Sequence, residues 1–458
     1  MTLRLDYSNM MEPIASGIAS AEWEQSLAAA RQAHAAVGKG RADGSVGFLD
    51  IASDTRLLAQ SLEFAGKVRR QFDDVVILGI GGSALGPIAL RTALRAYGWN
   101  TLSREERKEQ PRLHVLDNVD PVTIGALLDR IVLPRTLFVV TSKSGGTAET
   151  MAQFLIVHER LEIAGLPVAH HVVFITDPVQ GALRPLAEKL RVHALEIPAN
   201  VGGRFSILTP VGLLPAALIG IDISRVAAGA ADMASRCNDA SFESNPALVY
   251  ATLQWLADTK HGKHVHVFMP YSDPLRDFAA WFVQLWAESL GKQRSGAGVG
   301  PTPLAALGAT DQHSQVQLFM EGPADKTVTF VAVRERELDL KIPAAFGDVK
   351  ELGYLGGHSL AELIDVEQRA TAGALAQRGR PNMTISLDKI DGWHIGALIM
   401  FLEIATAYAG SLYGIDAFNQ PGVELGKQFA YAMLGRPGAE AARAEWDSLP
   451  KADHRWSV

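Results

Sequence analysis

The sequence predicts an α/β protein built from two successive blocks of parallel sheet with flanking helices. Short runs rich in Val, Ile and Leu, such as VVILGI (75–80), TLFVVTS (136–142) and HHVVFIT (170–176), lack the polar alternation of half-exposed strands. They fit strands that are buried on both faces. Helical stretches of about 10–18 residues separate these runs, as in a doubly wound α/β domain. Similar strand and helix patterns begin again near residue 244.

The elements follow one another in a regular order. The N-terminal segment is expected to hold a helix over 21–38 that ends at Gly38–Gly40. The other expected helices are 55–72, 247–262 and 277–291, and the other expected strands are 112–117, 192–198, 264–270, 328–335 and 382–387. We therefore divide the chain into an N-terminal helical segment (1–50), a first domain (51–200), a connecting segment (201–243), a second domain (244–410) and a C-terminal tail that contributes to the active site (411–458).

Composition and charge exclude several classes of protein. Of the 458 residues, 48% are hydrophobic and 20% are charged, which excludes intrinsic disorder. The net charge of −7 argues against a general nucleic-acid binder, which would present a basic surface. The one cysteine, Cys237, excludes an intrachain disulfide and indicates a reducing compartment, so we expect a cytoplasmic protein. We interpret Cys237 as a small buried hydrophobic residue.

Two apolar stretches require a test as membrane spans. The stretch 206–221 is broken by Pro210 and Pro215, and the stretch 395–410 carries Glu403 near its middle. A buried helix explains each stretch better than a span of about 20 uninterrupted apolar residues. The N-terminus also lacks the basic and apolar regions of a signal peptide. We expect a soluble protein with no membrane partner.

A glycine-rich turn follows the first strong strand. In LGIGGSALGP (78–87), glycines let backbone N–H groups approach a ligand just before a helix begins. Gly79, Gly81 and Ala84 also match the loose dinucleotide pattern G-x-G-x-x-A, but the next acidic candidate, Asp117, lies about 35 residues on instead of about 20. A tight turn that needs only glycine is the structural alternative.

A second loop, SKSGGTAET (142–150), also lies between an apolar run and a helix. Ser142, Ser144 and Thr147 supply hydroxyls, and the two glycines expose backbone donors, which together suit a phosphate monoester. The order of residues differs from a Walker A loop, because Lys143 precedes the glycines. An ordinary Ser/Thr helix cap is the alternative. Two such turns in one sheet favour a shared ligand.

A third motif, QLWAESLGK (284–292), holds Gln284 and Glu288 four residues apart, so both can lie on one helix face. A carboxylate among apolar side chains suits a base, although a glutamate near a helix end is more often a solvated charge. Three further pieces are weak alone, because such residues are mostly surface or packing residues: Arg204 after two glycines, His313 in DQH, and Gln420 and Lys427 around PGVELG.

Taken together, six segments resemble the phosphoglucose isomerase family. They are, in order, LGIGGSALGP, SKSGGTAET, GGRFS, QLWAESLGK, GATDQHS and QPGVELGK. The resemblance covers about residues 70 to 430 and implies two flavodoxin-like sugar-isomerase (SIS) domains, each a parallel sheet flanked by helices, plus a C-terminal helical tail. It implies an aldose–ketose isomerase that interconverts glucose 6-phosphate and fructose 6-phosphate without cofactor or metal. It also implies a homodimer with shared active sites.

The resemblance assigns roles to individual residues. Glu288 would be the proton-transferring base, Arg204 would stabilise an enediolate, and His313 and Lys427 would serve ring opening. The remaining residues would bind substrate, mostly its phosphate: Gly82, Ser83, Ser142, Lys143, Ser144, Thr147, Gln284 and Gln420. Residues 144–146 read Ser-Gly-Gly where many relatives are richer in Thr, so contacts through 145 and 146 would be made by backbone only.

Two other functions stay open at this stage. A sugar-phosphate-sensing module of the same fold would keep the phosphate loops without the catalytic groups. A nucleotide-dependent oxidoreductase would rest on the G-x-G-x-x-A pattern alone. Moving a proton between two carbons through a cis-enediol needs no hydride acceptor, which agrees with that weak dinucleotide pattern.

Overall fold

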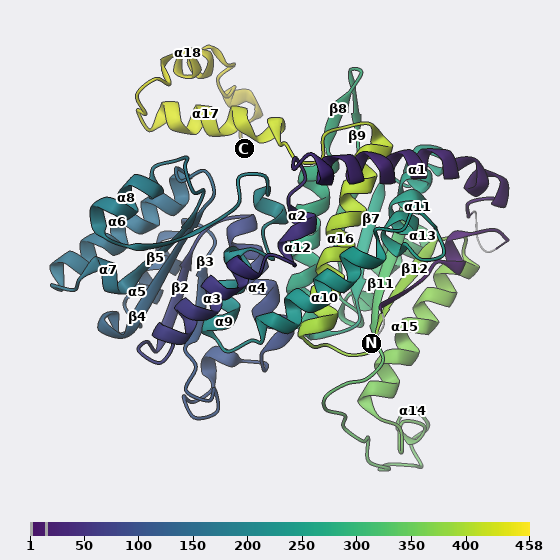
Figure 1. Cartoon of the computed structure of the whole chain (residues 1–458). Coiled ribbons are helices and arrows are strands. Elements are labelled where there is room, and N and C mark those ends of the chain that lie inside the picture. The colour runs from purple at the N-terminus through teal and green to yellow at the C-terminus, as the bar shows by residue number, and fades with distance from the viewer. Residues whose placement is uncertain (1–2, 14–16) are drawn as a thin grey trace.

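A five-stranded parallel sheet forms the first half of the chain in the computed structural model, which describes residues 3–13 and 17–458 (Figure 1). The strand order is β3-β2-β4-β5-β6. Numbered along the chain, this is the order 2-1-3-4-5 of flavodoxin-like folds. The strands are β2 (Asp74–Leu78), β3 (Arg112–Leu116), β4 (Thr136–Ser142), β5 (Val172–Thr176) and β6 (His193–Glu196).

Helices cover both faces of this sheet, as the uninterrupted apolar strands require. The strands β2, β4 and β5 are buried along their whole length. One face packs against α5, α6 and α8, and the other contributes to a core shared with the second half. The helices of this half are α3 (Thr55–Val68), α4 (Gly82–Leu94), α5 (Pro121–Leu128), α6 (Ala148–Ile163), α7 (Val168–His171), α8 (Leu183–Leu190) and α9 (Pro210–Leu218).

The second half repeats the same arrangement. Its sheet has the order β1-β12-β11-β7-β10. The four parallel strands β10-β7-β11-β12 again follow the order 2-1-3-4, so β7 and the helix after it, α12 (Arg276–Leu290), correspond to β2 and α4. The strands are β1 (Leu3–Asp6), β7 (Val265–Pro270), β10 (Thr302–Ala305), β11 (Lys326–Val333) and β12 (Asn382–Leu387). Two flavodoxin-like domains are therefore present, and the predicted fold class is confirmed.

The N-terminal segment differs from the expected helical piece in two ways. The strand β1 adds an antiparallel edge to the second sheet, with Leu3 opposite Leu387. The helix α1 (Ser20–Ala42) continues through Gly38 and Gly40, where we predicted its end. A Cβ on Gly40 would lie 2.6 Å from the Val46 side chain, so close packing explains this glycine better than a helix stop.

Helices also cover both faces of the second sheet. The outer face contacts α13 and α15, and the inner face joins α11, α12 and α16 in the shared core. The helices before the tail that have not yet been given are α2 (Phe48–Ile51), α10 (Ile223–Arg236), α11 (Pro246–His261), α13 (Val316–Glu321), α14 (Lys350–Gly353), α15 (Leu360–Gln377) and α16 (Gly392–Tyr413). Of the described helices, α16 alone is long and apolar enough to cross a membrane, but 94% of that stretch is buried inside the fold. It is a core helix, as we predicted.

The two domains meet along α4 and α12, which run antiparallel at the centre of Figure 1. At one end, Thr92 Oγ1 donates a hydrogen bond to Asp277 Oδ2 at 2.5 Å. At the other end, a Cβ on Gly81 would lie 2.8 Å from Nε2 of Gln284. The start of α4 therefore lies beside the end of α12, which carries Glu288.

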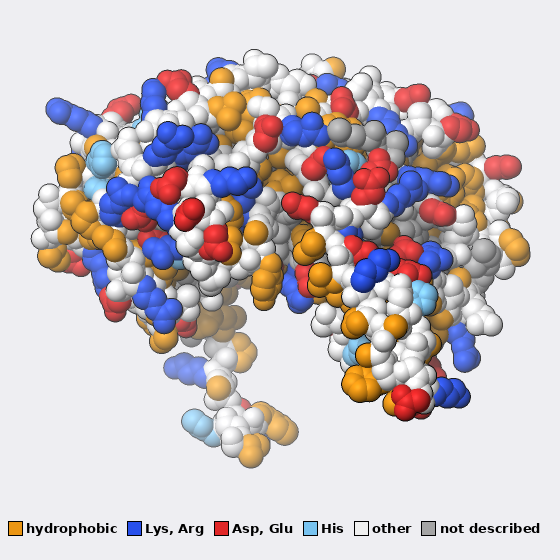
Figure 2. All heavy atoms as spheres, turned by 90° about the horizontal axis from the view of Figure 1, so that it is seen from below, with side chains coloured by type: hydrophobic (Ala, Val, Ile, Leu, Met, Phe, Trp, Pro, Cys, Tyr) orange, Lys and Arg blue, Asp and Glu red, His pale blue; other side chains and the backbone are white. Residues whose placement is uncertain are grey.

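Several peripheral elements were not predicted. They are the hairpin of β8 (Lys292–Arg294) and β9 (Ala297–Val299), the strand β10, and the helices α14 and α15. The segment around α14 projects from the body and exposes Leu338, Phe346 and Tyr354 among charged side chains (Figures 1 and 2). The predicted helical tail forms α17 (Glu424–Met433) and α18 (Glu440–Ser448), which stand apart from the first domain in Figure 1.

Candidate active site

The two predicted ligand loops lie side by side. The register of β2 and β4 places Leu78 opposite Val140, so the loops that follow both strands leave the same edge of the sheet. The strand β3, which follows β2 in the chain, pairs with β2 on the side opposite to β4. The strand order therefore reverses between β2 and β4, and ligands of such sheets bind at this switch point. Gly81 has φ 57° and ψ −125°, a conformation that favours glycine.

The hydroxyls of the second loop converge. Ser142 Oγ lies 2.9 Å from Thr147 Oγ1 and 3.4 Å from Ser144 Oγ. Thr147 occupies the N-cap position of α6, yet its side chain makes no capping hydrogen bond. The hydroxyl cluster is therefore more than an ordinary helix cap. It gathers donors at a helix N-terminus, where an anion is favoured.

The glycine turn of the first loop touches the segment that carries Arg204. A Cβ on Gly82 would lie 2.3 Å from the carbonyl oxygen of Gly203, and 3.0 Å from the backbone nitrogen of Arg204. Only a residue without a side chain permits this approach. The turn that precedes Ser83 is thus in direct contact with a second candidate residue from another part of the chain.

Arg204 is fixed by contacts on every side of its guanidinium. Its side chain is 2% exposed, in η4 (Gly203–Phe205). Nε donates to Ser289 Oγ at 2.7 Å, and Nη1 donates to Gln420 Oε1 at 3.0 Å. Nη2 donates to the carbonyl oxygens of Ala417 and Asn419 at 2.5 and 2.9 Å. Burial lowers the pKa of this guanidinium, while the carboxylate of Glu288 opposes that shift.

Glu288 joins Arg204 from the last turn of α12. Its Oε2 accepts a hydrogen bond from Arg204 Nη1 at 3.4 Å, and its Oε1 accepts one from Gln284 Nε2 at 3.1 Å. The predicted i, i+4 pair thus lies on one helix face. The Glu288 side chain is 34% exposed, so it remains open to a ligand while Arg204 is buried behind it.

Lys143 lies in the second predicted ligand loop (142–150), but its ammonium points away from the hydroxyl cluster of that loop. Nζ donates to the carbonyl oxygens of Ala199 and Val201 at 2.8 and 2.6 Å. Burial lowers the pKa of this ammonium, and Asp177 opposes the shift. A phosphate contact by the Lys143 side chain stays a prediction.

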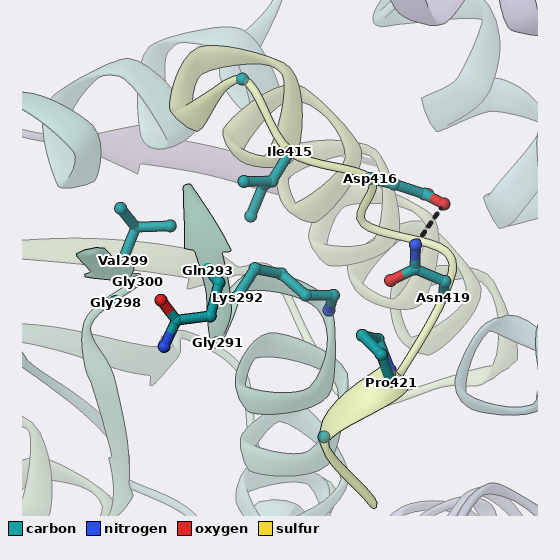
Figure 3. A pocket seen from close by; sticks show the side chains of 12 residues that line it. Gly291, Lys292, Gln293, Gly298, Val299, Gly300, Ile415, Asp416, Asn419 and Pro421 are labelled. Atoms are coloured by element: carbon teal, nitrogen blue, oxygen red, sulfur yellow. Dashed lines mark hydrogen bonds between the residues drawn. The ribbon is translucent and has the colours of Figure 1, made fainter. Parts of the chain in front are cut away.

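A cavity of about 760 Å³ adjoins the end of α12 (Figure 3). Lys292 lies between the helix end and the segment 414–422, and donates to the carbonyl oxygens of Glu288 and Ser289 at 2.5 and 3.0 Å. Asn419 Nδ2 donates to Asp416 Oδ2 on the opposite wall at 2.8 Å. Lys292 therefore holds the helix end that carries Glu288.

His313 does not reach this group within one chain. It is exposed at the end of η6 (Thr310–His313), which follows β10. Its neighbour Gln312 accepts a hydrogen bond from the hydroxyl of Tyr271, at 2.6 Å, near the start of α12. Glu288 lies at the other end of this helix of 15 residues, which spans about 22 Å.

Lys427 also lies away from the predicted site. It is on α17, 47% exposed, and donates to Glu424 Oε1 at 2.9 Å. The helices α17 and α18 pack on each other through Phe429 and Trp446, whose ring centroids are 5.5 Å apart. Gln420, seven positions earlier, does reach Arg204, so the tail begins at the site even though Lys427 is not part of it here.

Sequence reasoning missed the residues that hold Arg204 and the end of α12 in place. Ser289 and Lys292 lie within the motif that carries Glu288, and their position there is the signal that could have found them. The carbonyls of Ala417 and Asn419 carry no sequence signal, because any residue supplies a carbonyl.

Outside the site, Cys237 is buried as predicted, and burial raises the pKa of its thiol to about 12. Over residues 3–13 and 17–458, no group of three or more His, Cys, Asp or Glu is placed to hold a metal ion.

Comparison with known proteins identifies the family. A family model described as phosphoglucose isomerase matches residues 54–452. The chain belongs to the phosphoglucose isomerase family. Two curated relatives named glucose-6-phosphate isomerase cover nearly the whole chain. That of Rubrobacter xylanophilus is 44% identical over 95% of this chain and 99% of its own. That of Carboxydothermus hydrogenoformans is 43% identical over 97% of each.

Solved structures agree with this membership. A protein of Thermus thermophilus described as hypothetical is 37% identical, has a TM-score of 0.84, and covers 95% of this chain and 100% of its own. A glucose-6-phosphate isomerase of Chlamydia trachomatis is 26% identical, with a TM-score of 0.74 over 86% of this chain and 77% of its own. The resemblance drawn from six short motifs is confirmed, and all six lie inside the range that the phosphoglucose isomerase model matches.

Proposed function

We propose that this protein interconverts glucose 6-phosphate and fructose 6-phosphate through a cis-enediolate, with Glu288 as the base and Arg204 as the electrostatic partner. The observation that carries the proposal is the contact between the partly exposed carboxylate of Glu288 and the buried guanidinium of Arg204. This pair lies beside the glycine turn at Gly82, at the sheet edge where the two predicted ligand loops meet. Family membership supports the same reaction.

The substrate phosphate would bind at the edge formed by the loops after β2 and β4. Ser142, Ser144 and Thr147 would donate their hydroxyls, and the turn at Gly82 and Ser83 would close the other side. This contact is remote from the reacting carbons, so its binding energy can fix the position of C1 and C2 against Glu288.

Proton transfer between C1 and C2 would then use Glu288. A carbon acid of this kind is too weak for a carboxylate alone, so the negative charge on the enediolate oxygen needs a partner as it forms. Arg204 is permanently charged, and its hydrogen bonds fix its orientation before the substrate arrives. Gln284 and Gln420 would orient Glu288 and Arg204 through the contacts described above.

We further propose that ring opening uses His313 from a second copy of the chain. His313 is exposed, and its neighbour Gln312 contacts Tyr271 before the start of α12, whereas Glu288 lies in the last turn of this helix. An imidazole side chain can both donate and accept a proton, which suits proton exchange with the ring oxygen. A homodimer with shared sites would therefore complete the constellation. Lys427 is assigned to the same step from the family motif.

The experiment is a direct assay of fructose 6-phosphate conversion to glucose 6-phosphate, with chelator present and no added cofactor. We expect isomerisation under these conditions. Absence of conversion by well-folded protein would contradict the proposal. In parallel, NAD(P)H is added without a coupling enzyme, and a substrate-dependent absorbance change would indicate an oxidoreductase instead.

A further inference from the structure

The side chain of Lys143 joins two loops that serve different parts of the substrate. Its ammonium donates to the carbonyl oxygens of Ala199 and Val201 at 2.8 and 2.6 Å. Its backbone belongs to the loop of Ser142, Ser144 and Thr147, while Val201 lies three positions before Arg204. The side chain of Lys143 thus connects the proposed phosphate loop to the segment that carries Arg204.

Both ends of this connection are well anchored. Val201 and Ser142 are buried, and the Ser142 backbone carbonyl accepts a hydrogen bond from Thr176 Oγ1 at 2.8 Å. On the other side, Gly203 accepts a hydrogen bond from Ser206 Oγ at 2.6 Å, which fixes the turn before Arg204. A bond between two anchored segments sets the distance between them.

Resting on the isomerase function proposed above, we infer that Lys143 is a positioning residue that holds the phosphate loop in register with Arg204. The substrate is held at its phosphate, so the distance from that loop to Arg204 decides where the enediolate oxygen meets the guanidinium. A misplacement of about 1 Å at a reacting group can cost about 100-fold in rate. The role differs from that of a phosphate ligand, which would act on binding.

The two roles separate in kinetics. If Lys143 sets the register, its loss lowers kcat and the affinity for a ligand that uses both ends of the site. The affinity for inorganic phosphate, which uses one end, stays the same. If Lys143 is a phosphate ligand, its loss weakens inorganic phosphate and raises KM while kcat is kept.

The experiment compares wild type, Lys143→Met, Lys143→Arg and the control Lys189→Met, an exposed lysine in the last turn of α8. For each protein we measure kcat, the inhibition constant of inorganic phosphate, and that of an aldonic-acid phosphate whose carboxylate mimics the enediolate. For Lys143→Met we expect kcat to fall by about 10–100-fold, with the aldonic-acid phosphate weakened by a similar factor. The inhibition constant of inorganic phosphate should change by less than about 2-fold, and Lys189→Met should behave as wild type.

Lys143→Arg keeps the charge and donors on a planar head group, so we expect an intermediate kcat with unchanged phosphate inhibition. This variant decides the matter if Lys143→Met does not fold. Weakening of all ligands by one factor, or a loss of phosphate affinity with normal kcat, would overturn the inference. Absence of isomerisation by the wild type would instead contradict the proposed function, whatever the Lys143 variants do.

Discussion

Glu288 and Arg204 reach each other from separate parts of the fold, with 3.4 Å between Oε2 and Nη1. Glu288 lies in the last turn of α12, the helix after β7 in the second domain, and Arg204 follows the last strand of the first domain. The contact therefore depends on how α4 and α12 pack. It also explains why a carboxylate that is one-third exposed has a defined orientation before substrate binds.

The first prediction concerns Glu288. Glu288→Gln keeps the shape and the hydrogen bond with Gln284 but removes the base. We expect kcat to fall by about 10²–10⁴-fold, the range for a positioned acid–base group, while inhibition by a polyol phosphate stays near wild type. Steady-state kinetics and inhibitor titration check this. Turnover close to that of the wild type would exclude Glu288 as the base.

The loop proposed to bind the substrate phosphate gives the second prediction. Ser142→Ala combined with Thr147→Ala removes two converging hydroxyls, and we expect substrate and phosphate inhibitors to bind more weakly by about 1–3 kcal/mol. Since these contacts are remote from the carbons, KM should change more than kcat. Ser45→Ala, an exposed hydroxyl distant in sequence, is the control. Unchanged inhibition by a sugar phosphate would place the phosphate elsewhere.

Mixing two inactive variants tests the shared site. Glu288→Gln chains retain His313, and His313→Ala chains retain Glu288. In a dimer of one chain of each kind, one site would combine the intact Glu288 with the intact His313 of the partner subunit. We expect each variant alone to be nearly inactive and the co-expressed mixture to regain activity. No recovery, despite mixed dimers detected by differential tags, would contradict sharing.

Glu403 gives a prediction about stability and pH. It is fully buried in α16, and neither carboxyl oxygen has a hydrogen-bond partner among the described residues. Burial raises the pKa of this carboxyl well above its ordinary value. Above about pH 4.5 the unfolded chain then binds fewer protons than the folded one, so this group makes stability fall as pH rises.

Glu403→Gln removes that titration. We subtract the free energy of unfolding of the wild type from that of the variant. Between pH 5 and 7 we expect this difference to increase with rising pH, by up to about 1.4 kcal/mol per pH unit. Denaturant unfolding at several pH values measures it. A difference between the two proteins that does not vary with pH would show that Glu403 is ionised, or equally protonated, in both states.

The strands and the local parts of the site could be predicted because their signals are local. Runs such as VVILGI identify strands buried on both faces, and the four-residue spacing of Gln284 and Glu288 places them on one helix face. The contact of Arg204 with Glu288 joins residues 84 positions apart, so only the family motif indicated it. Short edge elements such as β1 and β10 have too few residues for a clear pattern, and pairing decides their conformation.

The position of His313 shows another limit. The family resemblance implied a catalytic role for His313 in a site shared between two copies, but the composition of the chain does not show which copy His313 serves. The direction of α12 supports the proposal of a second copy, because Gln312 bonds to Tyr271 just before this helix begins, whereas Glu288 lies in its last turn. Likewise, Lys143 stands in a phosphate motif, and only the three-dimensional arrangement brings its ammonium to the carbonyls of Ala199 and Val201.

The most direct test of the account measures two inhibition constants on folded Arg204→Ala protein, with Arg204→Lys as the partial replacement. An aldonic-acid phosphate carries the negative charge of the enediolate, whereas a polyol phosphate is neutral at that end. If Arg204 stabilises the enediolate, binding of the aldonic-acid phosphate should weaken by about 10²–10³-fold and binding of the polyol phosphate by only a few-fold. The value of kcat should fall by a factor similar to that for the aldonic-acid phosphate. Equal losses for both inhibitors would mean that Arg204 only anchors the segment 417–420, and would contradict the proposed mechanism.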